Sequence, residues 1–161
     1  MTDKDPESLR RKVDIFKTRA KDLRRWGRLQ EHERELVEII QSLDSKYEDL
    51  LIVVEGKRDV RVLENLGVKA PMIKTQSRLS RIDMAEHIAA KAGKKGKVLI
   101  LTDFDKEGRE ICSFIQKELE LSGVKVLKRE RRMIRKYMGP WRCIEEIASL
   151  FKRSDSPEAS R

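Results

Sequence analysis

The apolar residues of this chain follow two different spacings. In the first 45 residues or so, and again near the end, they recur every three or four positions, which is typical of one face of a helix, whereas the middle of the chain also holds short uninterrupted apolar runs. Such runs predict strands that are buried on both faces of a parallel sheet. We expect strands at 50–54, near Met72 and Ile73, at 98–102 and at 124–127.

Stretches with helical spacing separate these strands. The intervening helices are expected at about 58–66, 80–92 and 109–121, with Ile82 on the inward face of the second. The alternation indicates a βαβ series, and therefore an α/β domain over residues 50–127 with a roughly four-stranded, mainly parallel sheet flanked by helices.

A helical extension is expected before this domain, over residues 1–49. Gly27 separates a basic half from an acidic half: residues 9–28 hold nine Lys or Arg and two Asp, whereas residues 29–49 hold two Lys or Arg and seven Asp or Glu. The two halves could fold back on each other as a hairpin or continue as one bent helix. The basic half could contact the phosphates of a nucleic acid, and it could equally serve as a coiled-coil or homodimer interface.

A basic segment follows the predicted domain. Residues 128–153 are expected to form a helical tail that packs on the domain, with a break at Gly139 and Pro140 and an amphipathic helix from about Trp141 to Phe151. Residues 154–161 are polar and are expected to be disordered.

Carboxylates follow two of the predicted strands. Glu55 ends the first strand, and Asp103 and Asp105 follow the third. Because parallel strands end at one edge of a sheet, where open α/β sheets bind ligands, the three side chains could converge on one site. Asp103 and Asp105 are two positions apart, so both point to the same side of extended backbone. This pattern suits a hard cation, most simply Mg²⁺ with Mn²⁺ as an alternative, shared with a substrate phosphate.

The neighbours of these acids are further candidates. Glu107 is either another metal ligand or an ordinary first-turn acid favoured by the helix dipole. Gly56 permits a tight turn after the first strand, and the free amides at Gly108 could meet a phosphate oxygen. Lys106 is assigned to phosphate binding with the two glycines. Acids and glycines are also common after strands simply because they cap helices and form turns.

The two stretches that carry these acids resemble the two signature motifs of the Toprim domain. They read Val54-Glu55-Gly56-Lys57-Arg58-Asp59 and Asp103-Phe104-Asp105-Lys106-Glu107-Gly108. This α/β fold is shared by bacterial-type primases, type IA and type II topoisomerases, OLD-type nucleases, RecR-like repair proteins and the 5S rRNA maturase ribonuclease M5. The resemblance covers about residues 50–127, and the whole chain is most similar to small stand-alone Toprim proteins of archaea.

The resemblance implies a role for each acid. Glu55 would be the general acid or base, and Asp103 and Asp105 would hold Mg²⁺. Lys57 and Asp59 stand where ribonuclease M5 and the small archaeal proteins also tend to carry Lys and Asp, and Lys57 would offset phosphate charge as a further catalytic residue.

Departures from the larger relatives argue against a topoisomerase and against a complete primase. Type IA topoisomerases continue the second motif as D-x-D-R-E-G-E, but Arg109 stands at the last position here. Neither Tyr47 nor Tyr137 lies in an added domain large enough to form a DNA gate. A complete primase would normally carry a zinc module, and Cys112 and Cys143 lack the paired spacing of zinc ligands.

Composition favours a polyanionic partner. Lys and Arg number 37 against 28 Asp and Glu, so nucleic acid, either RNA or DNA, is the expected partner. The cations expected to contact it are Lys128, Arg129, Arg131, Arg132, Arg135 and Lys136. No apolar stretch approaches the roughly 20 residues that span a bilayer, and the N-terminus does not resemble a signal peptide. A cytoplasmic protein without a membrane partner is predicted.

These observations predict a Mg²⁺-dependent phosphoryl-transfer enzyme that acts on nucleic acid, most simply a nuclease: a hydrolase for RNA processing or DNA cleavage. Asp103 and Asp105 would hold the metal against the scissile phosphate, and Glu55 would handle protons or a second metal. The alternatives are a non-catalytic nucleic-acid-binding or assembly module, as in RecR-like proteins, and a minimal primase-like nucleotidyl transferase.

Overall fold

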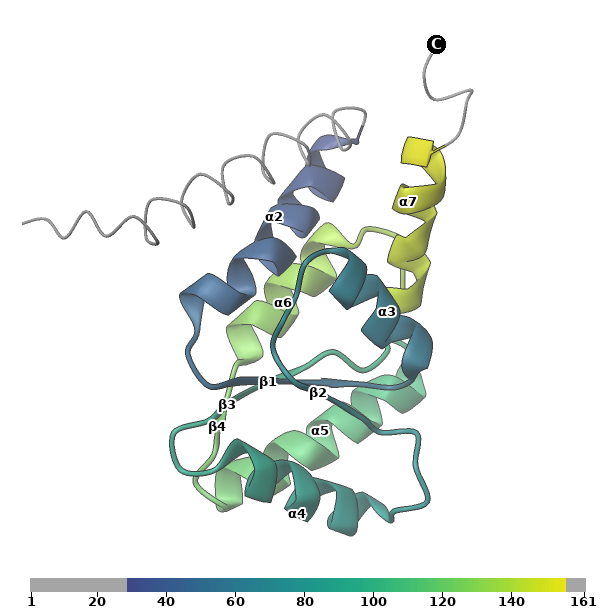
Figure 1. Ribbon diagram of the computed structural model, residues 1–161. Coiled ribbons are helices and arrows are strands. Elements are labelled where there is room, and N and C mark those ends of the chain that lie inside the picture. Colours follow the sequence, from purple (N-terminus) through teal and green to yellow (C-terminus); the bar gives the residue numbers. More distant parts are fainter. Residues whose placement is uncertain (1–28, 156–161) are drawn as a thin grey trace, which may run out of the picture.

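A four-stranded parallel sheet forms the centre of the protein in the computed structural model, which describes residues 29–155 (Figure 1). Its strands are β1 (Leu50–Val54), β2 (Met72–Lys74), β3 (Lys97–Ile100) and β4 (Lys125–Val126). They lie in the order β2-β1-β3-β4, and each neighbouring pair is parallel. The α/β class and the parallel sheet are therefore confirmed. The basic half at 9–28, the homodimer interface assigned to it, and residues 156–161 lie outside the described residues.

Helices cover both faces of this sheet (Figure 1). One face packs against α2 (Glu31–Lys46), α3 (Lys57–Asn65), α6 (Lys128–Tyr137), the 3₁₀-helix η1 (Ile144–Ile147) and α7 (Ala148–Asp155), and the other against α4 (Arg81–Ala92) and α5 (Lys106–Leu121). Alternation along β1 builds both cores: Ile52 and Val54 join the first cluster, Leu51 and Val53 the second. All five residues of β1 are buried, as its apolar run predicts.

The helices before and after the sheet pack against each other. Helix α2 contacts α6, where the hydroxyl of Tyr47 donates a hydrogen bond to the buried carboxylate of Glu130. Lys46 forms an ion pair with the same carboxylate at 3.6 Å. Burial and the neighbouring Glu130 raise the pKa of Tyr47 to about 12. The acidic half of the extension and the basic tail thus share one core with the sheet.

The connections between strands define where the sheet opens to a ligand. β1 continues through α3 to β2 on one side, whereas β3 continues through α5 to β4 on the other. The carboxyl ends of β1 and β3 therefore border a topological switch point, the place where open α/β sheets bind ligands.

Several local expectations differ from the structure, among them the following. Ile82 is 56% exposed, because the inward stripe of α4 is formed by Met84, Ala85 and Ile88 and a residue two positions before this stripe points away from it. β4 has two residues where four were expected. The helix expected from about Trp141 begins later, as η1 and then α7, because the residue before η1 is extended; α7 runs two residues into the segment expected to be disordered.

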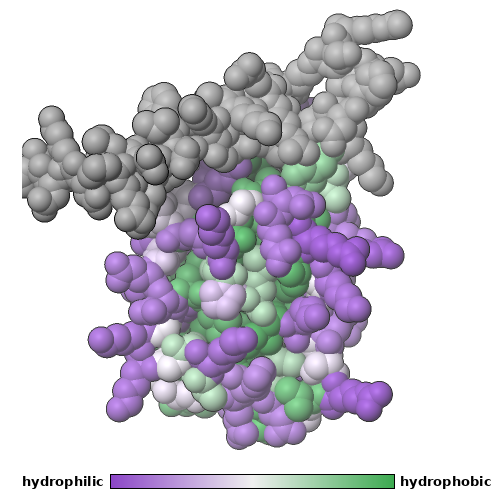
Figure 2. All heavy atoms as spheres, viewed as in Figure 1, coloured by the Kyte–Doolittle hydropathy of each residue, from purple (hydrophilic) through white to green (hydrophobic). Residues whose placement is uncertain are grey.

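The surface is largely hydrophilic. Figure 2 shows polar side chains projecting around much of the visible face, with hydrophobic surface between them. Within residues 29–155, no helix is both long enough and apolar enough to cross a membrane.

Candidate functional site

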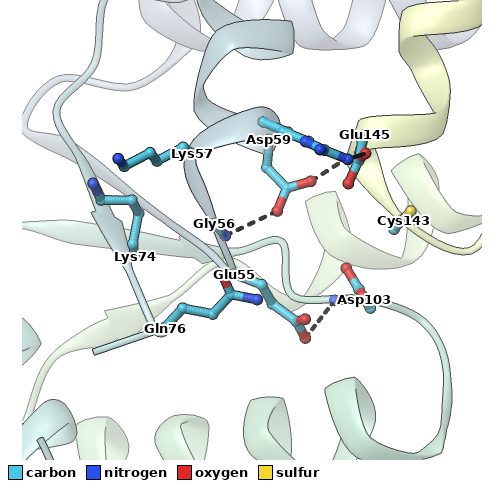
Figure 3. Close-up of a pocket in the computed structure, with 10 residues that line it drawn as sticks. Glu55, Gly56, Lys57, Asp59, Lys74, Gln76, Asp103, Cys143 and Glu145 are labelled. Carbon is cyan, nitrogen blue, oxygen red and sulfur yellow. Dashed lines mark hydrogen bonds and ion pairs between the residues drawn. The ribbon is translucent and has the colours of Figure 1, made fainter. Parts of the chain in front are cut away.

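A pocket of about 450 Å³ opens at the carboxyl ends of the central strands (Figure 3). Four parts of the chain line it: the end of β1 with the start of α3, the residues at and after the end of β2, the residue that follows β3 by three positions, and the approach to η1. The lining residues are Glu55, Gly56, Lys57, Arg58, Asp59, Lys74, Gln76, Asp103, Cys143 and Glu145. The pocket therefore lies at the topological switch point.

Glu55 and Asp103 form the acidic centre of this pocket. The sheet ladder brings them together: the N–H of Leu101 donates to Val53 at 2.7 Å, and two residues later the N–H of Asp103 donates to the carboxylate of Glu55 at 3.1 Å. Burial, the negative charge of Glu55 and a hydrogen bond to its side chain raise the pKa of Asp103 to about 7. At neutral pH this pair needs a proton or a cation.

Asp105, the third predicted acid, is placed differently. It is the N-cap of α5, and its Oδ1 accepts a hydrogen bond from the N–H of Gly108 at 2.7 Å. It is exposed and does not line the pocket. The cap also explains why α5 begins three residues earlier than predicted. Lys106 and Glu107 lie in the exposed first turn of the same helix.

The two glycines assigned to phosphate binding both have their amides occupied. The N–H of Gly108 is bonded to Asp105, and the N–H of Gly56 donates to Oδ2 of Asp59 at 3.1 Å. A phosphate could therefore use either amide only by displacing a carboxylate. Gly56 still lines the pocket, whereas Gly108 does not.

Asp59 ties the C-terminal segment to the site. It is only 5% exposed, and its second oxygen, Oδ1, accepts a hydrogen bond from the N–H of Glu145 at 3.0 Å. Burial raises the pKa of Asp59, although its backbone hydrogen bonds oppose that effect. Arg58 adds an ion pair to Glu145 at 2.9 Å. Helix α3 thus holds η1 as a wall of the pocket.

Two lysines line the pocket on the side away from Asp103 (Figure 3). Lys57 begins α3, one residue before the start that the sequence predicts, and Lys74 ends β2. Both are exposed, and neither forms an ion pair with another residue of the described chain. The pocket therefore has an acidic side and a basic side.

Sequence reasoning missed Lys74, Gln76, Cys143 and Glu145. The strand-end rule that found Glu55 would have found the first two, because β2 ends at the same edge of the sheet. Nothing comparable marks the others, which follow β3 by some 40 residues. Burial raises the pKa of Cys143 to about 12, so its thiol stays protonated and is a poor nucleophile.

The six cations assigned to nucleic acid do not all face solvent. Arg131 is half-buried and bonds backbone carbonyls, and Arg135 is partly buried and donates to the carbonyl of Gly139 at 3.1 Å. Lys128 is exposed, but it forms an ion pair with Glu120 at 2.6 Å. The remaining three are exposed: Arg129, Arg132 and Lys136. The basic surface of α6 is thus smaller than the sequence indicates.

An acidic centre at the switch point of a parallel sheet, followed by a D-x-D segment that caps a helix, defines an α/β domain of the Toprim type. The family model of the Toprim domain matches residues 50–136. The chain belongs to this family, which confirms the resemblance and associates the chain with metal-dependent functions related to nucleic acids. The match extends nine residues past the predicted domain end at 127, into α6.

The chain is also similar to small archaeal proteins. A UPF0292 protein of Methanocaldococcus jannaschii is 38% identical over 127 residues, covering 77% of this chain and 93% of that protein. A UPF0292 protein of Thermococcus gammatolerans is 40% identical over 124 residues, covering 76% and 88%. A solved structure of a protein from Aquifex aeolicus superimposes with a TM-score of 0.55 at 28% identity, covering 68% of this chain and 94% of that one.

Proposed function

We propose that this protein is a Mg²⁺-dependent phosphoryl-transfer enzyme that cleaves nucleic acid. The observation that carries the proposal is that one pocket at the switch point has an acidic and a basic side. Glu55 and Asp103 lie together in it, and Lys57 and Lys74, which form no ion pair within residues 29–155, lie across from Asp103. Such a pocket can hold a cation and a phosphate side by side.

The acidic side fits a hard divalent cation. Its donors are carboxylate oxygens, and the raised pKa of Asp103 indicates uncompensated negative charge that a cation would offset. Among the residues that the structure describes, no group of three or more His, Cys, Asp and Glu side chains is arranged to hold a metal ion. A Mg²⁺ site does not need such a group, because one or two carboxylates suffice and water and substrate phosphate complete the shell. Mn²⁺ accepts similar ligands.

The chain's own residues divide the remaining work. Asp103 and Glu55 would hold the cation, which when bound polarises the phosphoryl group. Glu55, fixed by the N–H of Asp103, either completes the metal site or accepts the proton of the attacking water. Lys57 and Lys74 would offset the charge of the substrate phosphates. Asp105 could add a ligand only through the oxygen that its helix cap leaves.

A non-catalytic nucleic-acid-binding module is the second candidate. The observation that favours it is the exposed cationic surface of α6 in a chain with a net charge of +9. Such a surface binds phosphates in a salt-dependent way without any chemistry.

Cleavage of RNA and DNA oligonucleotides with Mg²⁺, Mn²⁺ or EDTA separates the two candidates. We expect cleavage that requires the metal and falls about 100-fold in Glu55→Gln, because that change removes a charged oxygen from the acidic centre. The matched control is Glu110→Gln, an exposed acid of α5 outside the pocket. Salt-sensitive binding without cleavage in either metal would refute the enzyme and support the module.

Two substitutions separate a helix-capping role of Asp105 from a role as a metal ligand. Asn caps helices about as well as Asp, so Asp105→Asn should change stability by less than about 0.5 kcal/mol, whereas Asp105→Ala should cost about 1 kcal/mol. If Asp105 also ligates the metal, as the sequence predicts, Asp105→Asn should weaken Mg²⁺ binding several-fold. Thermal unfolding and calorimetric titration with Mg²⁺ measure the two effects. Unchanged Mg²⁺ affinity in Asp105→Asn would leave Asp105 as a cap alone.

A further inference from the structure

Arg131 differs from the exposed cations of α6 because its guanidinium points into the protein. Nη1 donates to the carbonyl of Ile100 at 3.0 Å and to that of Thr102 at 2.9 Å, and Nη2 donates to that of Asp103 at 3.4 Å. The guanidinium carbon lies 4.4 Å from the ring centroid of Phe104. One planar group thus contacts the segment that leaves β3 along its course from Ile100 to Phe104.

The early end of β4 explains why this segment needs a donor. The carbonyls of Val98, Ile100 and Thr102 face the same edge of β3, since backbone direction alternates along a strand. The N–H of Leu127 reaches the first of them at 2.8 Å, and then the chain turns into α6. The other two carbonyls lie beyond the last residue of β4, beside side chains that are buried, and buried carbonyls require partners. Arg131 supplies the donors that a longer strand would have supplied.

The opposite edge of the same segment faces the acidic centre. There the N–H of Leu101 donates to Val53, and the N–H of Asp103 donates to Glu55. The segment is therefore held from both sides, by β1 with Glu55 on one and by Arg131 on the other. If the backbone of this segment shifted on the Arg131 side, the position of Asp103 relative to Glu55 would change.

We propose that Arg131 is a positioning residue: it completes the edge of β3 beyond the end of β4 and thereby fixes Asp103 beside Glu55. The consequence for metal binding rests on the proposed function, whereas the consequence for the backbone does not. Lysine cannot replace it, because a single ammonium group cannot reach three carbonyls and stack on Phe104 together. Arg132, the next residue of α6, is exposed and belongs to the surface that suits nucleic acid.

The test compares Arg131→Lys and Arg131→Gln with the matched control Arg132→Gln. In the metal-free protein, amide hydrogen exchange of Asp103 should accelerate at least about tenfold in both Arg131 variants, relative to the amide of Leu119, which reports global unfolding. Mg²⁺ affinity should fall about tenfold or more, as for other changes in the support of metal ligands. Oligonucleotide binding in EDTA should stay within about twofold. Arg132→Gln should show the reverse: unchanged exchange and Mg²⁺ affinity, with weaker binding and a smaller salt slope.

One result would overturn the role proposed for Arg131. If Arg131→Lys leaves the exchange of Asp103 and the Mg²⁺ affinity unchanged and weakens oligonucleotide binding as Arg132→Gln does, Arg131 is an ordinary phosphate contact. If the wild type binds no Mg²⁺, the proposed function fails, but the exchange of Asp103 still decides the role of Arg131. Phe104→Leu removes the stacking surface and should give the same pattern in weaker form, which keeps the test open if Arg131→Gln does not fold.

Discussion

Replacing Asp103 with Asn should abolish metal-dependent cleavage and at the same time stabilise the metal-free protein. Cleavage should fall about 1000-fold or to the level seen in EDTA, because the acidic centre would lose one of its two carboxylates and with it the charge that attracts the cation. Stability should rise because burial and Glu55 make an ionised Asp103 unfavourable, and an amide can still donate a hydrogen bond to Glu55.

The stabilisation should depend on pH in a defined direction. The pKa of Asp103 is about 7 in the folded protein, whereas the ordinary value for an aspartate is 3.8, so the folded state binds the proton more tightly than the unfolded state. Below pH 3.8 both states are protonated, and the residue has no effect. As pH rises from about 4 to 7, the unfolded state releases its proton while the folded state keeps it, so stability falls; above about pH 7 the folded state also ionises, and the loss stays constant. Because the side chain is partly exposed, solvent screening should reduce the gain in Asp103→Asn to about 1 kcal/mol at pH 8.

Thermal unfolding at pH 8 and pH 4, with and without Mg²⁺, measures these effects. Without metal, Asp103→Asn should melt about 3 °C higher than the wild type at pH 8 and equally at pH 4. Mg²⁺ should stabilise the wild type, by about 2.7 kcal/mol at 100 times its Kd, and not the variant. Glu86→Gln, an exposed acid in the middle of α4, is the control and should change neither value. A variant that is less stable at pH 8, or that retains Mg²⁺-dependent stabilisation, would contradict this account of the acidic centre.

The central strands and the acidic pair were accessible from the sequence because both depend on local signals. The apolar run of β1 predicts its bounds without error, and a strand that ends in Glu or Asp places that side chain at the carboxyl edge of a parallel sheet. Asp105 shows where the rule stops. Two side chains that are two residues apart point to the same side only along an extended strand. That regularity does not hold as far as Asp105, because Asp105 caps α5.

Arg131 was grouped with the exposed cations of its stretch because that stretch was interpreted by charge. Residues 128–136 hold six cations, which indicates a solvated basic face. The helical period also indicates that Arg131 faces the protein interior: it precedes Ile134 by three positions and Met138 by seven, so it lies on the face of α6 that those buried residues share. The wall formed by Cys143 and Glu145 had no such signal, since it depends on the tertiary contact between Asp59 and the start of η1.

Gly108, in the turn that leads from β3 into α5, leaves no room for a side chain. A Cβ added there would overlap the backbone carbonyl of Asp103, with its carbon only 2.6 Å from the carbonyl carbon and 2.9 Å from Cα. The surrounding contacts leave little freedom: the N–H of Gly108 is held by Asp105, and its carbonyl accepts a hydrogen bond from the fully buried Thr102 at 2.8 Å. Because the obstacle is backbone, a side-chain rotation cannot relieve it.

Gly108→Ala should therefore destabilise the protein by about 3 kcal/mol and remove Mg²⁺ binding, because the turn must open and carry Asp103 away from Glu55. The direction is diagnostic, since Ala in place of Gly within a helix normally stabilises by up to about 1 kcal/mol. Urea unfolding gives the stability, and titration with Mg²⁺ under folding conditions gives the metal affinity. Glu110→Ala, at an exposed position of the same helix, is the matched control and should stay within about 0.5 kcal/mol of the wild type. If Gly108→Ala proved as stable as the wild type, the close approach of Asp103 to the first turn of α5 could not be a fixed feature of the site.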